Sequence, residues 1–516
     1  MLSPFINETY LDFSIPANRK SMMDAIGLVE GTFGRHYPLN VGGKEIYTDR
    51  EIASLNPSDP SQVVGFVSSA TPEIADQAVR AAHEAFAAWS SWQPEARARI
   101  LLRAAAIMRR RRLELDAVEV LEAGKPWLEA DADVAEAIDF CEFYAREAIR
   151  YGAPQPTVQL PGEEDTACYI PCGVTVVIPP WNFPLAIACG MTTAALVAGN
   201  TVVLKPASPT PVIAWYLAQI LREAGLPEGV LQFCPGSGGA MGDTLVAHPL
   251  TRIIAFTGSM SVGIHINELA SKVQPGQIWL KRVIAEMGGK DAIVVCDDAD
   301  DLCEAARGAV AAAFGYQGQK CSACSRLIVM DEVYDKVVAC VVEATREITV
   351  GASKDLASRM GPVITESAMK SIMAYIEIGN GEGTLLCGGF RAEGPGYFLQ
   401  PTVFGDVKQG ARIEQEEIFG PVLAITRAVD FDDALRIANG TIYGLTGALY
   451  SRSRQRLERA RREFHVGNLY LNRKCTGAMV GAHPFGGFNM SGTDSKAGGR
   501  DYLALFMQGK SVAERM

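Results

Sequence analysis

One cysteine stands in a loop whose composition suits a nucleophile. Cys321 follows the glycine-rich segment 315–319 and comes directly after Lys320. A thiolate attacks carbonyl carbons, and a neighbouring ammonium group lowers the pKa of a thiol. The pattern predicts covalent catalysis through Cys321. Because a free thiol has a pKa of about 8.5, the site must lower that pKa or remove the proton when substrate binds.

Cys321 and Cys324 also form a C-x-x-C motif, which leaves two other interpretations open. A redox pair of the thioredoxin kind is expected in a much smaller βαβ protein than this one. A zinc site needs further ligands, but the sequence has no second C-x-x-C and no histidine at ligand spacing. No metal is therefore expected.

Three more loops could assist a nucleophile. Asn182 lies between prolines that fix the backbone, and its amide could donate to an oxyanion. The segment 256–263 passes from a strand pattern through a Gly/Ser turn into a helix pattern, which suits an anion, although it lacks the Gly-x-Gly-x-x-Gly fingerprint. The acidic segment 414–421 precedes another strand pattern. Taken singly, these loops could equally be a rigid turn, a plain helix start and a solvated loop.

Alternating strand and helix patterns must position these loops. Strand patterns occur at 173–179, 201–204, 230–233 and 252–256, and helix patterns at 185–197, 211–224 and 241–247. A second series of strands begins at Ala292 and continues at 326–329 and 421–425. Repeated βαβ units with right-handed crossovers build a doubly wound parallel sheet. The sequence therefore predicts an α/β fold with a change of domain at 286–290.

Composition narrows the class of protein. The chain has 516 residues, of which 48% are hydrophobic and 21% charged, and its net charge is −11. This length corresponds to about three domains and buries a large core without disulfides or a structural metal. The negative charge opposes binding to nucleic acid or anionic lipid. The basic run 109–112 lies in a helical pattern at 97–121 and is interpreted as a solvated face.

Targeting and redox features indicate a cytoplasmic protein. The longest nearly apolar stretch, 185–199, has 15 residues, fewer than the roughly 20 that span a bilayer. The first twenty residues show neither a secretory signal nor a transit peptide. The twelve cysteines are scattered, mostly in apolar context, and are expected to be reduced thiols.

Seven short motifs occur in a fixed order between residues 180 and 488. They are Pro-Trp-Asn-Phe-Pro (180–184), Lys-Pro (205–206), Phe-Thr-Gly-Ser (256–259), Glu-Met-Gly-Gly-Lys (286–290), Gly-Gln-Lys-Cys (318–321), Glu-Glu-Ile-Phe-Gly-Pro (416–421) and Pro-Phe-Gly-Gly-Phe (484–488). Each is weak alone, but in this order the chain resembles the aldehyde dehydrogenase family over essentially its whole length. Segments 314–326, 464–470 and 476–481 resemble the branch that acts on 1-pyrroline-5-carboxylate, whose open form is L-glutamate γ-semialdehyde.

The resemblance implies a three-part architecture. A doubly wound, Rossmann-like NAD-binding domain with an N-terminal arm would occupy 1–150 and 173–285, and an α/β catalytic domain 286–489. A small β-flap and tail, 151–172 and 490–516, would join subunits. The implied assembly is a homo-oligomer, a dimer or a multiple of dimers, acting on a small molecule.

The resemblance also assigns catalytic roles. Cys321 would attack the aldehyde, and the Asn182 amide with the Cys321 N–H would hold the oxyanion. A hydride would pass to the nicotinamide, leaving a thioester. Glu286 would activate the water that releases the acid, work that suits a carboxylate whose pKa is raised by an apolar pocket.

The cofactor residues follow from the same resemblance. They would be Pro179, Trp181, Lys205, Ser208, Gly258, Ser259, Gly288, Glu417 and Phe419. Many NAD-preferring relatives carry Glu where this chain has Ser208, and a Glu there would repel a 2′-phosphate by about 1 to 4 kcal/mol. Ser208 removes the repulsion without adding a positive charge. NAD is therefore the expected cofactor, with NADP tolerated.

Substrate selection would depend on a few small and aromatic residues. Ser322 and the backbone N–H groups of Gly477 and Ala478 would hold the α-carboxylate, because small residues let the main chain approach an anion. Phe183 and Phe485 would form the apolar walls. A tight turn at 476–478 without a binding role is the alternative. Succinate semialdehyde is the rival substrate, and a non-catalytic relative is the rival class of protein.

Overall fold

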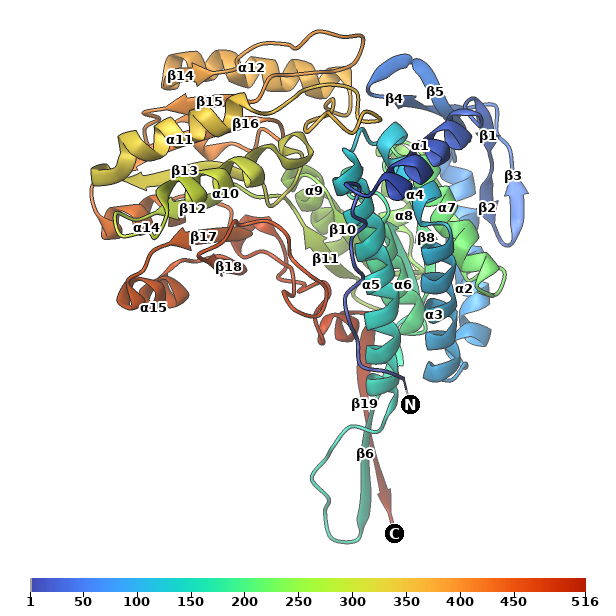
Figure 1. The fold of residues 1–516 in the computed structure, drawn as a ribbon. Helices are drawn as coiled ribbons and strands as arrows, with labels where there is room; N and C mark the ends of the chain where they lie inside the picture. The colour runs from blue at the N-terminus through green and yellow to red at the C-terminus, as the bar shows by residue number, and fades with distance from the viewer. Residues whose placement is uncertain (1) are drawn as a thin grey trace.

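Seven strands form the first large sheet of the structure, a computed structural model that describes residues 2–516 (Figure 1). Its order is β11-β10-β7-β8-β9-β2-β3. The first five strands are parallel to one another, whereas β2 pairs antiparallel with both of its neighbours, β9 and β3. Their bounds are β2 (Leu39–Val41), β3 (Lys44–Ile46), β7 (Val174–Ile178), β8 (Thr201–Leu204), β9 (Leu231–Phe233), β10 (Thr251–Thr257) and β11 (Arg282–Glu286). Residue 1, where the predicted NAD-binding part begins, lies outside the described residues.

Helices connect the parallel strands and cover the sheet. They are α6 (Ala186–Val197), α7 (Pro211–Glu223), α8 (Ala240–Ala247) and α9 (Met260–Ser271). Helix α6 is buried on nearly every side, which explains why its sequence is apolar all round rather than amphipathic. Strands β7 and β8 consist almost entirely of buried Val, Thr, Ile and Leu, as expected of strands covered on both faces.

The N-terminal region adds helices and a small sheet to this body. Helices α1 (Pro16–Glu30), α2 (Pro72–Ser90), α3 (Pro94–Arg110), α4 (Arg112–Glu122) and α5 (Trp127–Gly152) accompany a sheet of order β1-β5-β4, formed by β1 (Arg35–Tyr37), β4 (Glu51–Asn56) and β5 (Asp59–Ser68). The helical pattern at 97–121 is two helices, because the backbone leaves the helical region at Arg111. The basic run is also less solvated than expected, since Arg112 is buried and pairs with Asp131 at 2.7 Å.

A second seven-stranded sheet follows in the order β14-β15-β16-β13-β12-β17-β18. Its strands are β12 (Asp291–Val295), β13 (Cys324–Met330), β14 (Thr384–Cys387), β15 (Thr402–Gly405), β16 (Val422–Ala428), β17 (Thr446–Tyr450) and β18 (Asn468–Leu471), all parallel to their neighbours except β14. The accompanying helices are α10 (Leu302–Phe314), α11 (Tyr334–Arg346), α12 (Glu366–Glu382), α13 (Arg412–Gln415), α14 (Phe431–Asn439) and α15 (Arg454–Glu463). Short 3-10 turns lie at η1 (Gly315–Gly318), η2 (Asp331–Val333), η3 (Asn489–Ser491) and η4 (Tyr502–Phe506).

The last sheet has two antiparallel strands that extend away from the body (Figure 1). It pairs β6 (Glu163–Pro171) with β19 (Met507–Arg515) residue for residue along their whole length. The α/β class with doubly wound parallel sheets is confirmed. The boundaries of the three parts stay a prediction.

One pair of cysteines departs from the expectation of reduced thiols. Cys303 and Cys340 are joined by a disulfide, because α10 and α11 pack side by side and bring their Cα atoms to 5.3 Å. The other ten cysteines are free. Among the described helices, none is both long and apolar enough to cross a membrane.

Candidate active site

The two large sheets face each other through opposite ends of their parallel strands. In the first sheet, the carboxyl ends of β7, β8, β10 and β11 lead to Pro179, Lys205, Gly258 and Glu286. In the second sheet, the amino ends of β12, β13 and β16 are preceded by the loops that hold Gly288, Cys321 and Glu417. Loops at the carboxyl ends of an open parallel sheet are where α/β proteins bind ligands.

Two cavities lie between these loops and meet at the candidate nucleophile. The larger has a volume of about 550 Å³ and the smaller about 170 Å³. Both are lined by Phe256, Thr257, Glu286 and Cys321. A ligand in one cavity and a ligand in the other would therefore meet beside the same thiol and the same carboxylate.

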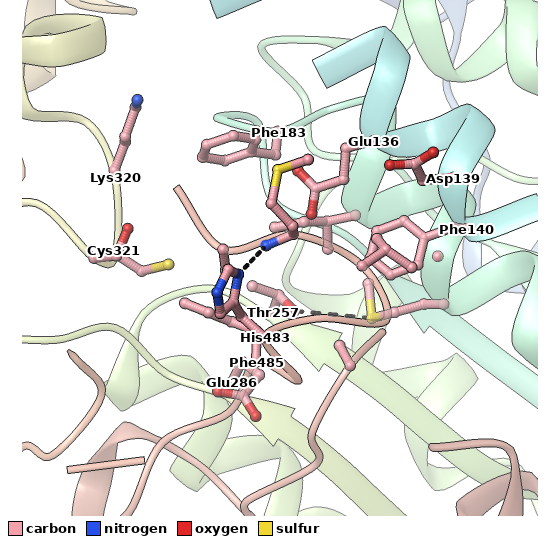
Figure 2. A pocket seen from close by; sticks show the side chains of 18 of the residues that line it. Glu136, Asp139, Phe140, Phe183, Thr257, Glu286, Lys320, Cys321, His483 and Phe485 are labelled. Carbon is pink, nitrogen blue, oxygen red and sulfur yellow. Dashed lines mark hydrogen bonds between the residues drawn. The ribbon is translucent and has the colours of Figure 1, made fainter. Parts of the chain in front are cut away.

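The nucleophile loop is held by its backbone and by buried amides. Tyr316 and Gln317 have φ of 49° and 58°, and the Gln317 amide donates to the carbonyls of Gly124 and Pro362. Cys321 follows on this turn, and Figure 2 shows its sulfur directed into the smaller cavity. The loop therefore presents the thiol at a fixed position between the two cavities.

The electrostatics of Cys321 differ from the prediction of a lowered pKa. The Lys320 ammonium does not serve the thiol, because it pairs with Glu129 at 2.6 Å. Burial, followed by the negative charges of Asp291, Glu417 and Glu286, raises the pKa of the Cys321 thiol well above its ordinary value. The thiol is therefore neutral until a base removes its proton, so the thiolate forms by proton removal and not through a lowered pKa.

Asn182 has the geometry of an oxyanion donor. Its Nδ2 donates one hydrogen bond, 2.9 Å long, to the carbonyl of Gln319, two residues before Cys321. An amide nitrogen carries two N–H groups, so one stays available after this bond has oriented the side chain. The N–H of Cys321 has no partner within residues 2–516 either. Both donors predicted for the oxyanion are thus near the nucleophile and free to bind.

Glu286, the last residue of β11, is the candidate base. Burial raises the pKa of its carboxyl group to about 7, although hydrogen bonds from Ser495 and Gly487 lower it. A carboxyl group that titrates near neutral pH can take a proton from a thiol or from water and return it. Glu286 therefore suits both proton transfers of the predicted reaction.

The larger cavity brings together nearly all the residues predicted to bind the cofactor. Among its lining are Pro179, Trp181, Lys205, Gly258, Ser259, Gly288, Glu417 and Phe419. Ser208 is the exception, because it is exposed on the turn after Lys205 and does not line the cavity. Ser259 precedes α9 directly, so this helix begins at the cavity as the Gly/Ser turn predicts. The rings of Trp181 and Phe419 meet edge to face at 5.4 Å.

The smaller cavity brings together all five residues predicted to bind substrate. Phe183, Ser322, Gly477, Ala478 and Phe485 all line it. Gly477 has φ of +84°, which a side chain would disfavour, and it places the loop that follows β18 beside the cavity. Within residues 2–516, the N–H groups of Gly477 and Ala478 have no hydrogen-bond partner. They can therefore bind an anion.

Several lining residues were missed by the sequence prediction. Glu136 reaches the smaller cavity from α5, and His483 reaches it from the loop after Gly477 (Figure 2). Glu129, also on α5, lines the same cavity. Desolvation, followed by the charge of Asp133, raises the pKa of Glu136 to about 8. The available signal was the spacing of acidic residues at 129, 133 and 136, which places them on one face of an otherwise buried helix.

The structure does not join the C-x-x-C cysteines. Cys321 and Cys324 are both free, and the buried Cys324 thiol donates to the carbonyl of Arg326 at 3.4 Å. The part of the chain that the structure describes contains no group of three or more His, Cys, Asp and Glu side chains that could hold a metal ion.

Known proteins share this sequence and this fold. The sequence model of the aldehyde dehydrogenase family matches residues 46–512. The chain is 59% identical over 514 residues to a 1-pyrroline-5-carboxylate dehydrogenase of a Geobacillus strain, WCH70, with full coverage of both proteins.

Solved structures agree with this match. A 1-pyrroline-5-carboxylate dehydrogenase from Thermus with bound NAD is 51% identical, with a TM-score of 0.98 and full coverage of both chains. Proline utilization A from Bdellovibrio bacteriovorus is 47% identical, with a TM-score of 0.98 over 99% of this chain and 53% of that one. The motifs, the site and the matches agree, and the chain belongs to the aldehyde dehydrogenase family.

Proposed function

We propose that this chain oxidises L-glutamate γ-semialdehyde, the open form of 1-pyrroline-5-carboxylate, to L-glutamate, with NAD as the hydride acceptor. The observation that carries the proposal is the junction of two cavities at Cys321 and Glu286, with the N–H groups of Gly477 and Ala478 beside the smaller one and without a partner among the described residues. Full-length similarity to 1-pyrroline-5-carboxylate dehydrogenases supports the choice of substrate.

The chain's own residues account for both halves of the reaction. Glu286 takes the proton of the Cys321 thiol, directly or through water, and the thiolate attacks the aldehyde carbon. Asn182 and the Cys321 N–H stabilise the resulting oxyanion; losing one such donor typically costs about 3 to 4 kcal/mol. Loss of a hydride from the thiohemiacetal leaves a thioester on Cys321. Glu286 passes the proton taken from the thiol to solvent and then takes a proton from the water that attacks the thioester; the acid departs and the Cys321 sulfur regains a proton.

The far end of the substrate carries charges that the smaller cavity complements. The α-carboxylate accepts hydrogen bonds from the N–H groups of Gly477 and Ala478 and from the Ser322 hydroxyl, all at the cavity wall. The α-ammonium faces the carboxylate of Glu136, whose ionised form it stabilises. Phe183 forms an apolar wall beside the methylene groups.

The larger cavity fits a dinucleotide. Lys205 is 6% exposed, and its ammonium makes no hydrogen bond or ion pair within the described residues, so it is available to ribose hydroxyls. Glu417 lies so close to Gly288 that a Cβ there would sit 2.5 Å from its carboxylate oxygen, which explains the glycine. These residues would hold NAD, and NAD would supply the acceptor for the hydride.

NADP is expected to support measurable but slower turnover than NAD. Ser208 lies outside the larger cavity but directly follows Ala207, which lines it, and it places neither a repelling carboxylate nor a positive charge near a 2′-phosphate. Ser208→Glu is expected to lower kcat/KM with NADP by about tenfold and to change the value with NAD much less, because a carboxylate repels the extra phosphate. Steady-state kinetics with both cofactors measure this. Complete absence of turnover with NADP in the unaltered enzyme would refute the argument from Ser208.

A comparison of three aldehydes tests the proposed substrate. We expect kcat/KM for L-glutamate γ-semialdehyde to exceed the value for propanal, which has no carboxylate, by about a hundredfold, the effect of two charge-assisted hydrogen bonds after allowance for non-additivity. We expect it also to exceed the value for succinate semialdehyde, which lacks the α-ammonium and whose carboxylate lies one carbon nearer to the aldehyde. Succinate semialdehyde is disfavoured because no arginine lines the smaller cavity among the described residues. Arg473, the nearby candidate, donates to the carbonyls of Thr476 and Gly477. Preference for succinate semialdehyde would overturn the assignment.

The two-stranded sheet is proposed to join subunits into a homo-oligomer. An isolated pair of strands is marginally stable in water, and exposed strand edges favour pairing with another chain. Val158 and Leu160, in the loop before β6, are 85% and 55% exposed, and Val512 of β19 is 41% exposed. Light scattering of the full-length protein measures the number of subunits.

A further inference from the structure

A short segment near the C-terminus pairs with the strand that ends in the candidate base. Residues 491–495 run antiparallel to the end of β11, with a bridge between Glu286 and Gly492. Met287 N donates to the carbonyl of Ser491 at 2.7 Å, and Thr493 N donates to the carbonyl of Ala285 at 2.9 Å. The main chain on both sides of Glu286 is therefore held by this segment.

Ser495, at the end of this segment, and Gly487, just before it, also donate to the Glu286 carboxylate itself. The Ser495 hydroxyl donates to Glu286 Oε1 at 2.7 Å, and Gly487 N donates to Oε2 at 3.2 Å. Ser495 N lies farther from Oε1, at 3.4 Å. Ser495 is 4% exposed, and Glu286 is the acceptor of its hydroxyl. Of the three donors, the hydroxyl therefore makes the shortest bond.

Glycines leave room for the carboxylate at this position. A Cβ on Gly486 would lie 3.1 Å from Glu286 Oε1, and a Cβ on Gly492 would lie 3.1 Å from Oε2 and 2.4 Å from the carbonyl of Ala285. Gly492 has φ of +158°, at the edge of the range that residues with a side chain rarely adopt. The segment is thus shaped around the Glu286 side chain as well as its backbone.

We propose that Ser495 is a positioning residue for the general base, and that its hydroxyl holds Glu286 ionised and directed for the hydrolysis of the thioester. This rests on the role proposed above for Glu286. A hydrogen bond donated to a carboxylate stabilises the charged form, and the charged form is the one that accepts a proton from water. Ser495 thereby sets the pH range in which the second half of the reaction proceeds.

Other charged groups near Glu286 are fixed and do not replace the hydroxyl. The Lys496 ammonium, which lowers the pKa of Glu286, donates to the carbonyls of Gly467 and Gly486 and pairs with Asp494. Among the described residues, Cys321 and Tyr502 also interact with Glu286, and burial raises the pKa of both. Both are therefore neutral near pH 7 and place no charge beside Glu286. Removing the Ser495 hydroxyl therefore removes a hydrogen-bond donor from the Glu286 carboxylate and raises its pKa.

The test uses hydrolysis of p-nitrophenyl acetate by the full-length enzyme without NAD. The initial burst of nitrophenolate reports acylation of Cys321, and the steady-state rate reports attack of water on the acyl thioester. Ser495→Ala is expected to move the acidic limb of the steady-state pH profile upward by about one pH unit, because loss of the donor raises the pKa of the base. The burst amplitude is expected to persist.

Two further variants separate positioning from structural damage. Ser495→Thr keeps a hydroxyl and is expected to restore the original limb. Ser491→Ala removes another buried hydroxyl of the same segment. That hydroxyl accepts a hydrogen bond from Gly444 N and does not contact Glu286, so the variant is expected to leave the acidic limb of the pH profile in place. An unchanged limb in Ser495→Ala, or an equal shift in Ser491→Ala, would overturn the proposal.

Glu286→Gln distinguishes this inference from the assignment on which it rests. We expect this variant to be acylated more slowly, because Glu286 also takes the proton of the Cys321 thiol, and to lose the steady-state phase. If it keeps full steady-state turnover, Glu286 is not the base, and both the assignment and the role of Ser495 fall. If it loses that phase while Ser495→Ala shows no shift, only the role of Ser495 is wrong.

Discussion

Replacement of Cys321 with alanine is expected to abolish aldehyde oxidation. The expected loss in kcat is about 10⁴-fold or more, as is typical when a covalent nucleophile is removed. The Cys321 thiol lines both cavities, and its thiolate can bond to a carbonyl carbon. Without it no thiohemiacetal forms, so no hydride is released. The rate of NADH formation from L-glutamate γ-semialdehyde measures the effect.

Cys324→Ala is the matched control for this prediction. Cys324 is buried behind the loop, with its thiol on the carbonyl of Arg326, and it lines neither main cavity. Its replacement is expected to change kcat by less than about threefold, since the lost contact is a weak hydrogen bond. A severe loss in Cys324→Ala together with activity in Cys321→Ala would restore the redox-pair interpretation of the C-x-x-C motif.

A bulky residue at position 478 is expected to damage recognition of the natural substrate selectively. In Ala478→Leu the side chain would occupy the space in which we propose that the α-carboxylate approaches the N–H groups of Gly477 and Ala478. Loss of these charge-assisted hydrogen bonds is expected to raise KM for L-glutamate γ-semialdehyde by about a hundredfold. Propanal has no carboxylate, so its KM is expected to change only a few-fold. Initial rates with both aldehydes measure the difference.

Ala478→Gly is the control, because it keeps the backbone donors and adds no volume. Its KM for L-glutamate γ-semialdehyde is expected to stay within a few-fold of the original value. Equal increases for the two aldehydes in Ala478→Leu would mean that the leucine merely blocks the cavity. The 476–478 turn would then have no role in anchoring the carboxylate.

The sequence was sufficient to predict the elements that carry the site, because each motif is local. Buried β-branched runs and the turns that follow them predicted the strands before Pro179, Lys205 and Gly258, and the structure has β7, β8 and β10 there. The Gly/Ser turn before α9 was predicted for the same reason. The break between α3 and α4 at Arg111 was not, since the helical pattern continues through it.

Contacts between residues far apart in the chain could not be predicted from the sequence. The prediction paired Lys320 with Cys321 because they are adjacent in the chain, whereas the folded protein pairs Lys320 with Glu129. The Cys303–Cys340 disulfide likewise depends on the packing of α10 against α11. Adjacency in sequence says little about which charges meet, because side chains of neighbouring residues point in different directions.

The amino-acid sequence by itself indicated the proposed chemistry of this protein: a thiol and an amide in loops beside predicted strands, and a carboxylate, Glu286, named by the family resemblance and found at the end of β11, a strand that was not predicted. Only the tertiary structure decided the electrostatics, namely that burial leaves the Cys321 thiol protonated and that Ser495, more than two hundred positions away, donates to Glu286. The physical reason is that residue types set which bonds can form, while pKa values depend on desolvation and on charges that only folding brings together.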